Sequence, residues 1–174
     1  MGSYLFTGGR FLDPRRDELI GGVEVLVEDN LVKEVSDRPI TATTAQRIDI
    51  GARTLMPGLI DAHIHLVLTE VNLQLMADIP LTLLSAKGSV AMRAMLERGF
   101  TTLRDTGGAD WGIKAAVEQG LFVGPRLFIA GQPLSQTGGH GDFRKRTQTQ
   151  TFCACCSGLS LLHLPLRARK AKCR

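Results

Sequence analysis

An alternation of strands and helices over residues 56–130 constrains the fold of this chain more than any other feature. Three apolar runs have the length and composition of buried strands, at residues 59–66, 100–104 and 126–130. Segments with a helical period separate them, at residues 84–98 and 110–120. Consecutive strand–helix units give parallel strands joined by right-handed crossovers. The pattern therefore predicts an α/β fold, either an open doubly wound sheet or a (β/α)8 barrel.

Both helical segments carry signals for their ends and their buried faces. Gly99 is placed to end the first helix in a left-handed conformation, and Asp110 and Gly120 are placed to begin and end the second. The buried stripe of the first helix is expected to comprise Val90, Ala91, Ala94 and Met95. That of the second is expected to comprise Ile113, Ala116 and Val117.

The first 55 residues are typical of short strands punctuated by turns. Gly8-Gly9 predicts a tight hairpin between the strands on either side of it, at residues 4–7 and 10–12. Asp29-Asn30 predicts a second turn between alternating runs at residues 23–28 and 31–35, and a further strand is expected at residues 47–50. We expect a small antiparallel sheet that is too thin to be stable without something to pack against.

Two histidines lie near the end of the first apolar strand, in Asp61-Ala62-His63-Ile64-His65. Because strand side chains alternate in direction, Asp61, His63 and His65 would share one face. Two imidazoles with this spacing can bind one metal ion. Two histidines without further ligands are, however, also compatible with surface or structural histidines. Since active sites of such folds lie at the carboxyl ends of the strands, the pair is expected beside the loops at residues 105–108 and 131–142.

Charge and cysteine are concentrated at the C-terminus. Residues 1–142 hold 13 Lys+Arg against 17 Asp+Glu, whereas residues 143–174 hold 8 Lys+Arg, no acidic residue and all four cysteines. The spacing of Cys153, Cys155 and Cys156 near His163 lacks the paired C-x2-C of zinc fingers. The basic tail has no aromatic residues interleaved with its charges, so we expect no nucleic-acid partner. The alternative is a metal- or nucleic-acid-binding module built on this tail.

Apolar patterning argues against a membrane location. The N-terminus has no long apolar region typical of a signal peptide, and no stretch approaches the roughly 20 apolar residues of a membrane span. We therefore expect a cytoplasmic protein that does not bind membranes.

The segment Met-Pro-Gly-Leu-Ile-Asp-Ala-His-Ile-His-Leu at 56–66 resembles the first barrel strand of the metal-dependent amidohydrolases. The most similar branch holds imidazolonepropionase and the prolidase-like Xaa-Pro and Xaa-Arg dipeptidases. The N-terminal strands and the segments at 99–105 and 137–142 agree in order and spacing. This resemblance implies the first three βα units of a TIM barrel in residues 56–150. The strands of a composite β-sandwich domain precede them in residues 1–55, and an atypical tail follows at 151–174.

The resemblance also assigns chemistry to particular residues. It implies that His63 and His65 bind a divalent metal, usually zinc, in a mono- or binuclear centre. Such a metal lowers the pKa of its bound water to about 7, which generates hydroxide, and polarises the carbonyl of the bond to be cleaved. The expected reaction is hydrolysis of C–N bonds in amides, dipeptides or cyclic amides.

Three further residues are candidates for supporting roles. His140 is the candidate for contact with substrate, and Asp61 and Asp105 are candidates for orienting the metal ligands. The alternative for Asp61 is a carboxylate satisfied by backbone. For Asp105, together with Arg104, the alternatives are a buried ion pair or a helix cap.

Most of the ligands that the resemblance demands are missing from this sequence. Family members take a carboxylated lysine or glutamate from the fourth strand, histidines from the fifth and sixth, and a catalytic aspartate from the eighth. No such strands follow the third one here, so the catalytic residue is unknown and we expect no measurable turnover. We interpret the tail as a frameshifted or prematurely terminated product of a longer gene. The alternative is a non-catalytic fragment or pseudoenzyme with weak metal binding, whose open barrel edges favour self-association.

Overall fold

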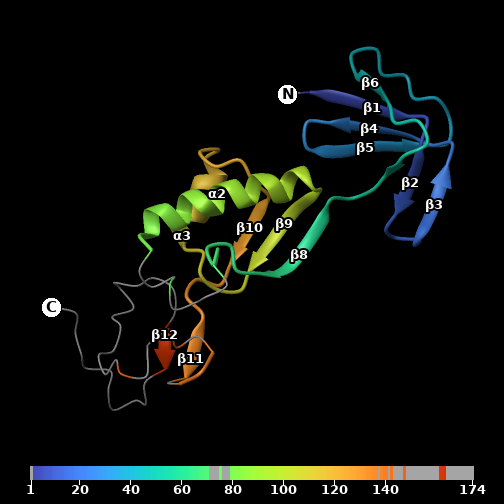
Figure 1. Ribbon diagram of the computed structural model, residues 1–174. Coiled ribbons are helices and arrows are strands. Elements are labelled where there is room, and N and C mark those ends of the chain that lie inside the picture. The colour runs from blue at the N-terminus through green and yellow to red at the C-terminus, as the bar shows by residue number, and fades with distance from the viewer. Residues whose placement is uncertain are drawn as a thin grey trace. The chain divides into compact units, whose positions relative to one another are not determined.

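A computed structural model describes residues 2–70, 75, 79–136, 138–140, 142, 147 and 161–163. The chain forms a mixed α/β structure that divides into two compact units, Met1–Pro57 and Gly58–Arg174 (Figure 1). Among the residues described, no helix is both long and apolar enough to cross a membrane.

The first unit holds two mixed sheets. One sheet has the order β5-β4-β1-β6 and is built from Leu31–Ser36 (β5), Glu24–Glu28 (β4), Ser3–Thr7 (β1) and Gln46–Asp49 (β6). The other has the order β3-β2-β7 and is built from Glu18–Gly21 (β3), Arg10–Asp13 (β2) and Thr54–Leu55 (β7). β6 runs parallel to β1, and β7 runs parallel to β2. The expectation of a purely antiparallel sheet is therefore wrong.

The hairpin predicted at Gly8-Gly9 is also wrong. β1 pairs with β4 and β6, whereas β2 pairs with β3 and β7, so the glycine pair carries the chain from one sheet to the other. Gly8 has a φ of +82°, and a Cβ on Gly9 would overlap the side chain of Ile50. Glycine is needed here because two backbone segments pass close to each other. A glycine pair is equally typical of a hairpin turn, so the sequence does not distinguish the two. The turn predicted at Asp29-Asn30 is confirmed, since it joins the antiparallel strands β4 and β5.

The second unit contains the strand–helix alternation expected from the sequence. Three parallel strands form a sheet in the order β10-β9-β8, from Arg126–Ile129 (β10), Phe100–Asp105 (β9) and Leu59–Ile64 (β8). Two helices connect them in sequence, Leu81–Glu97 (α2) and Trp111–Glu118 (α3). Both helices pack on one face of this sheet (Figure 1). The carboxyl ends of all three strands therefore lie at one edge.

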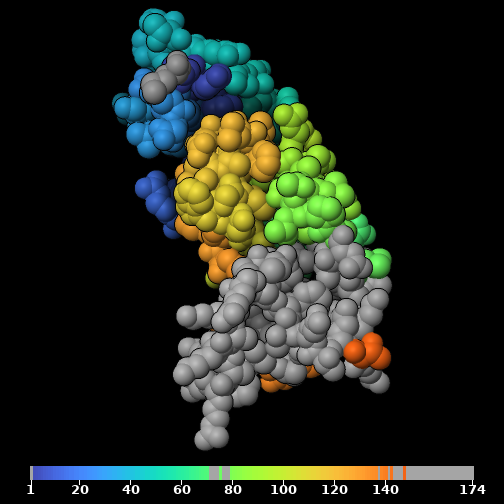
Figure 2. All heavy atoms as spheres, turned by 90° about the vertical axis from the view of Figure 1, so that its left-hand side faces the viewer, coloured from blue at the N-terminus to red at the C-terminus, as the bar shows by residue number. Residues whose placement is uncertain are grey.

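The core of this unit lies between the sheet and the helices. Its buried side chains come from both helices, from β9 and β10, and from the loops at the strand ends: Leu66, Val67, Leu84, Met92, Leu103, Ala109, Ile113 and Leu127. Complete burial of a Leu or Met side chain stabilises a fold by about 2–3 kcal/mol. On the surface, α2 (green) adjoins the region of α3 (yellow) (Figure 2).

The buried stripe of α2 differs from the predicted one. The buried residues of this helix are Leu84, Gly88 and Met92. Of the predicted stripe, Ala91 and Met95 pack partly against the core, but Val90 is 69% exposed. Apolar residues occur on several faces of this helix, so its sequence supports more than one buried phase. Gly99, with a φ of +93°, follows the end of α2 as predicted.

The predicted beginning and end of α3 are confirmed. The Asp110 side chain accepts a hydrogen bond from the backbone N–H of Ile113 at 2.9 Å, which is the bond of an N-cap. Gly120 has a φ of +72° just beyond the end of the helix. Of its predicted buried stripe, Ile113 is buried and Val117 packs against the core, but the buried alanine is Ala115 rather than Ala116.

The face of the sheet away from the helices is open among the described residues. Ile60 of β8 is 68% exposed, and Phe128 of β10 is 52% exposed. We predicted a buried strand at residues 126–130, and the exposure of Phe128 corrects this for β10. β8 and β10 are the outer strands of this sheet.

Two short strands follow that were not expected. Leu134–Gln136 (β11) pairs in parallel with Leu161–His163 (β12). The cysteines and basic residues of the C-terminal tail lie outside the described residues, as does the zinc-finger interpretation of Cys153, Cys155 and Cys156.

Candidate metal centre

His63 and His65 lie together at the carboxyl end of β8. The strand ends at Ile64, so His65 is the first residue beyond it. The two ring centroids are 5.4 Å apart, and the ring planes are nearly perpendicular at 79°. Both side chains are exposed. The predicted pair is thus brought together where the strand ends.

The simple alternation predicted for residues 61–65 does not hold. The register between β8 and β9 shifts between Asp61 and Ile64. An Asp61 carboxylate oxygen accepts a hydrogen bond from the backbone N–H of His63 at 3.1 Å. A short acidic side chain that binds the backbone two residues on competes with the regular strand ladder. The Asp61 carboxylate therefore accepts a hydrogen bond from the backbone, as the alternative interpretation of this residue expected.

The ring of His65 is held by the loop that follows β9. Its Nδ1 lies 2.9 Å from the carbonyl oxygen of Gly107. Because a carbonyl can only accept a hydrogen bond, this contact requires the proton on Nδ1 and leaves the lone pair of Nε2 available. Histidines that bind metals commonly donate their other ring N–H to a carbonyl or carboxylate. The environment of His65 therefore fits that of a metal ligand.

The backbone around His63 is fixed on both sides. The Nε of Arg104 donates to the carbonyl oxygen of Ala62 at 2.8 Å. The backbone N–H of Thr106 donates to the carbonyl oxygen of Ile64 at 2.9 Å. These bonds tie the end of β8 to the end of β9, so the histidine between them is held on an ordered segment.

Asp105 is a completely buried carboxylate at the end of β9, with 0% exposure. One oxygen accepts from the backbone N–H of Leu66 at 2.7 Å. The other accepts from the N–H groups of Gly107 at 2.8 Å and of Ala109 at 3.2 Å. The carboxylate therefore binds the loops that follow β8 and β9. Since its oxygens accept from backbone amides and Arg104 donates to Ala62, the alternative of an ion pair between Asp105 and Arg104 is wrong.

His140 lies in a turn after β11 and is exposed. The turn is closed by the backbone N–H of Gly138, which donates to the Asp142 carboxylate at 2.8 Å. Within the described part of the chain, no group of three or more His, Cys, Asp or Glu side chains is close enough to hold one metal ion. The structure thus unites His63 and His65, but it does not bring His140, Asp61 or Asp105 into a ligand cluster with them.

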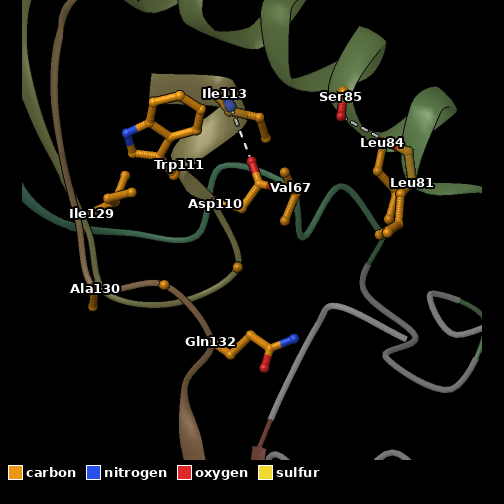
Figure 3. Close-up of a pocket in the computed structure, with 12 residues that line it drawn as sticks. Val67, Leu81, Leu84, Ser85, Asp110, Trp111, Ile113, Ile129, Ala130 and Gln132 are labelled. Carbon is orange, nitrogen blue, oxygen red and sulfur yellow. Dashed lines mark hydrogen bonds between the residues drawn. The ribbon is translucent and has the colours of Figure 1, made fainter. Parts of the chain in front are cut away.

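A cavity of about 520 Å³ lies at the same end of the sheet (Figure 3). It opens among the loops that follow the strands and the first turns of α2 and α3. The exposed ring of Trp111 and the capping side chain of Asp110 lie at one side, and Leu81 and Ser85 lie at the other (Figure 3). Its described lining residues do not include His63 or His65. We therefore do not assign it to the chemistry of the histidines.

Gly107 is the contributor that side-chain patterns missed. It acts through its carbonyl oxygen, and a main-chain group leaves no mark in residue type. The only signal in the sequence is the glycine itself, and the structure gives its reason, since a Cβ at Gly107 would lie 2.6 Å from Pro133. The glycine therefore permits a close approach of the loops after β9 and β10.

Several known proteins are similar to this chain in sequence and fold. The model of the Amidohydrolase family matches residues 54–163. A crystal structure of a prolidase complexed with N-methylphosphonate-L-proline is 42% identical, with a TM-score of 0.85, over 92% of this chain and 40% of that chain. A crystal structure of an amidohydrolase is 47% identical, with a TM-score of 0.84 and the same coverage. Ochratoxinase from Aspergillus niger is 34% identical over 137 residues, which are 75% of this chain and 28% of that protein. The chain spans less than half the length of each of these relatives.

Proposed function

The chain belongs to the amidohydrolase family, and we propose that it supplies the first-strand side of a divalent-metal site for the hydrolysis of C–N bonds. His63 and His65 would hold the metal, with zinc as the expected ion. The observation that carries the proposal is the histidine pair at the end of β8. The ring centroids are 5.4 Å apart, and Nδ1 of His65 is hydrogen-bonded to the carbonyl of Gly107.

We further propose that the second unit is the first part of a (β/α)8 barrel. In such a barrel, parallel strands neighbour one another in chain order, with helices outside and side chains filling the interior. The order β10-β9-β8, the helices on one face and the open face that bears Ile60 and Phe128 support this assignment. The open face would then line the barrel interior, next to the histidines. The strands of residues 1–55 would belong to a composite β-sandwich domain.

The substrate class follows from the chemistry of the site and from the relatives. Amidohydrolases generally use divalent metals, which activate a water molecule and polarise the carbonyl under attack. Within this chain, His65 would present Nε2 through the bond of its Nδ1–H to Gly107, and Arg104 would hold the backbone beside His63. A prolidase and an ochratoxinase are among the relatives. We propose a small amide or dipeptide substrate, with His140 as a candidate contact.

A second candidate function is a non-catalytic chain with weak metal binding. The observation that favours it is the ligand count, because the two histidines lie together but no group of three or more His, Cys, Asp or Glu side chains among the described residues could hold a metal ion. Zinc sites in proteins usually have three or four protein ligands. The two candidates differ in whether the histidines support turnover once the rest of a hydrolase site is supplied.

A chimera separates these candidates. Residues 1–136 would replace the aligned segment of the 42%-identical prolidase, and hydrolysis of an Xaa-Pro dipeptide would be measured. We expect turnover from the chimera and none from the 174-residue chain alone, because only the chimera combines the histidines with the remaining site. Replacing both histidines with asparagine should lower kcat/KM of the chimera by at least about 100-fold, since loss of a supporting partner alone costs about 10–100-fold. A folded chimera whose activity survives this change would refute the proposed role.

A further inference from the structure

A buried carboxylate outside the proposed ligand pair is connected to it by a chain of hydrogen bonds. Asp105 accepts from the N–H of Leu66 at 2.7 Å, and this N–H belongs to the peptide that follows His65. It also accepts from the N–H of Gly107 at 2.8 Å. The carbonyl of the same Gly107 binds the His65 ring at 2.9 Å. Asp105 is therefore linked to His65 in two ways. It binds the backbone N–H that follows His65, and it binds Gly107, whose carbonyl binds the His65 ring.

We propose that Asp105 is a positioning residue that fixes the ring orientation and the Nδ1–H tautomer of His65. The effect of Asp105 on the His65 ring does not depend on the proposed function. Only its consequence, that Nε2 is presented to a metal, rests on that function. Without the carboxylate, the loop after β9 would lose the two bonds that Asp105 makes to Gly107 and Ala109. The Gly107 carbonyl would then no longer be held opposite His65.

The position requires a carboxylate rather than an amide. Three N–H donors converge on its two oxygens, one from the loop after β8 and two from the loop after β9. An ionised carboxylate accepts at both oxygens, whereas an asparagine has one acceptor and one NH2 donor. The side chain introduced by Asp105→Asn could satisfy one loop only, because its NH2 group would face an N–H donor of the other. A buried N–H donor left without a partner destabilises the folded state.

The test compares Asp105→Asn with a matched control in the full chain. Asp110→Asn makes the same chemical change at the cap of α3, where asparagine is also a good capping residue. The tautomer of His65 is read from its ring nitrogen chemical shifts at a pH of about 8, where a free imidazole is neutral. The affinity for Zn²⁺ is measured by titration on the same samples.

We expect the Nδ1–H tautomer of His65 in the unmodified chain and in Asp110→Asn, and a mixture of tautomers in Asp105→Asn. The Zn²⁺ affinity of Asp105→Asn should fall by about 10–100-fold, the usual cost of removing a partner that orients a ligand. A purely structural role for Asp105 would lower the unfolding temperature and leave the tautomer of the folded protein unchanged.

A second variant covers the case in which Asp105→Asn fails to fold. Gly107→Ala places a Cβ 2.6 Å from Pro133 and should displace the carbonyl that binds His65 while leaving Asp105 in place. We expect the same loss of the Nδ1–H tautomer. An Nε2–H tautomer in the unmodified chain, or an unchanged tautomer in folded Asp105→Asn, would overturn the inference. Failure of the unmodified chain to bind Zn²⁺ would instead count against the proposed function, because the tautomer is measured without metal.

Discussion

Replacing His65 with alanine is expected to weaken binding of Zn²⁺ to the chain by at least about 100-fold, because loss of a partner that merely orients a ligand already costs about 10–100-fold. His65 is the histidine whose ring is oriented by the carbonyl of Gly107. Its removal leaves His63 as the remaining member of the pair. Calorimetric titration of Zn²⁺ into the metal-free chain measures the change.

His140→Ala provides the control for this experiment. His140 is also exposed, but it lies in the turn after β11 and outside any described cluster of ligands. We expect its replacement to leave the Zn²⁺ affinity within about a factor of two, since surface substitutions away from a site change free energies by less than about 0.5 kcal/mol. Equal losses for His65→Ala and His140→Ala would show that the metal binds histidines without regard to the pair.

Met92→Ala is expected to lower the free energy of unfolding of the second unit by about 3 kcal/mol, as removal of a fully buried Met side chain leaves a cavity. Met92 has 0% exposure and belongs to the core between α2 and the sheet. Val90→Ala lies on the same helix, where the side chain is 69% exposed, and should change this free energy by less than about 0.5 kcal/mol. Urea unfolding followed by circular dichroism compares the two.

The same pair of variants tests the phase of α2. The sequence pattern predicted Val90 in the buried stripe and left Met92 out of it. A larger loss for Val90→Ala than for Met92→Ala would restore the predicted phase and contradict the packing described for this helix.

Local signals predicted the elements that surround the site. The apolar runs at β8, β9 and β10 and the cap at Asp110 were identified because each depends on residues adjacent in sequence. Gly99 and Gly120 marked the helix ends because both adopt a positive φ, which glycine tolerates best. The proximity of His63 and His65 was predicted from their spacing near a strand end, although the alternation assumed for that prediction does not hold.

Features that depend on distant parts of the chain were not predictable in this way. Gly8-Gly9 has the composition of a hairpin turn, but the partners of β1 and β2 come from residues much further along. The shift in register at β8 depends on the Asp61 side chain binding its own backbone. Asp105 was identified as a candidate, but its hydrogen bonds, on which the proposed role rests, go to amides 39 residues earlier and 2 to 4 residues later. Sequence spacing does not reveal which backbone groups a buried carboxylate will meet.

The most direct test of a metal site at the end of β8 is a Zn²⁺ titration of the chain, uniformly labelled with ¹⁵N, followed through the ring nitrogens of its four histidines. We predict that the Nε2 signals of His63 and His65 shift together at the lowest Zn²⁺ concentrations, while Nδ1 of His65 stays protonated. His140 and His163 should respond only at higher concentrations. A first response at His140 or His163, with the signals of the pair unchanged, would contradict a metal site at this pair.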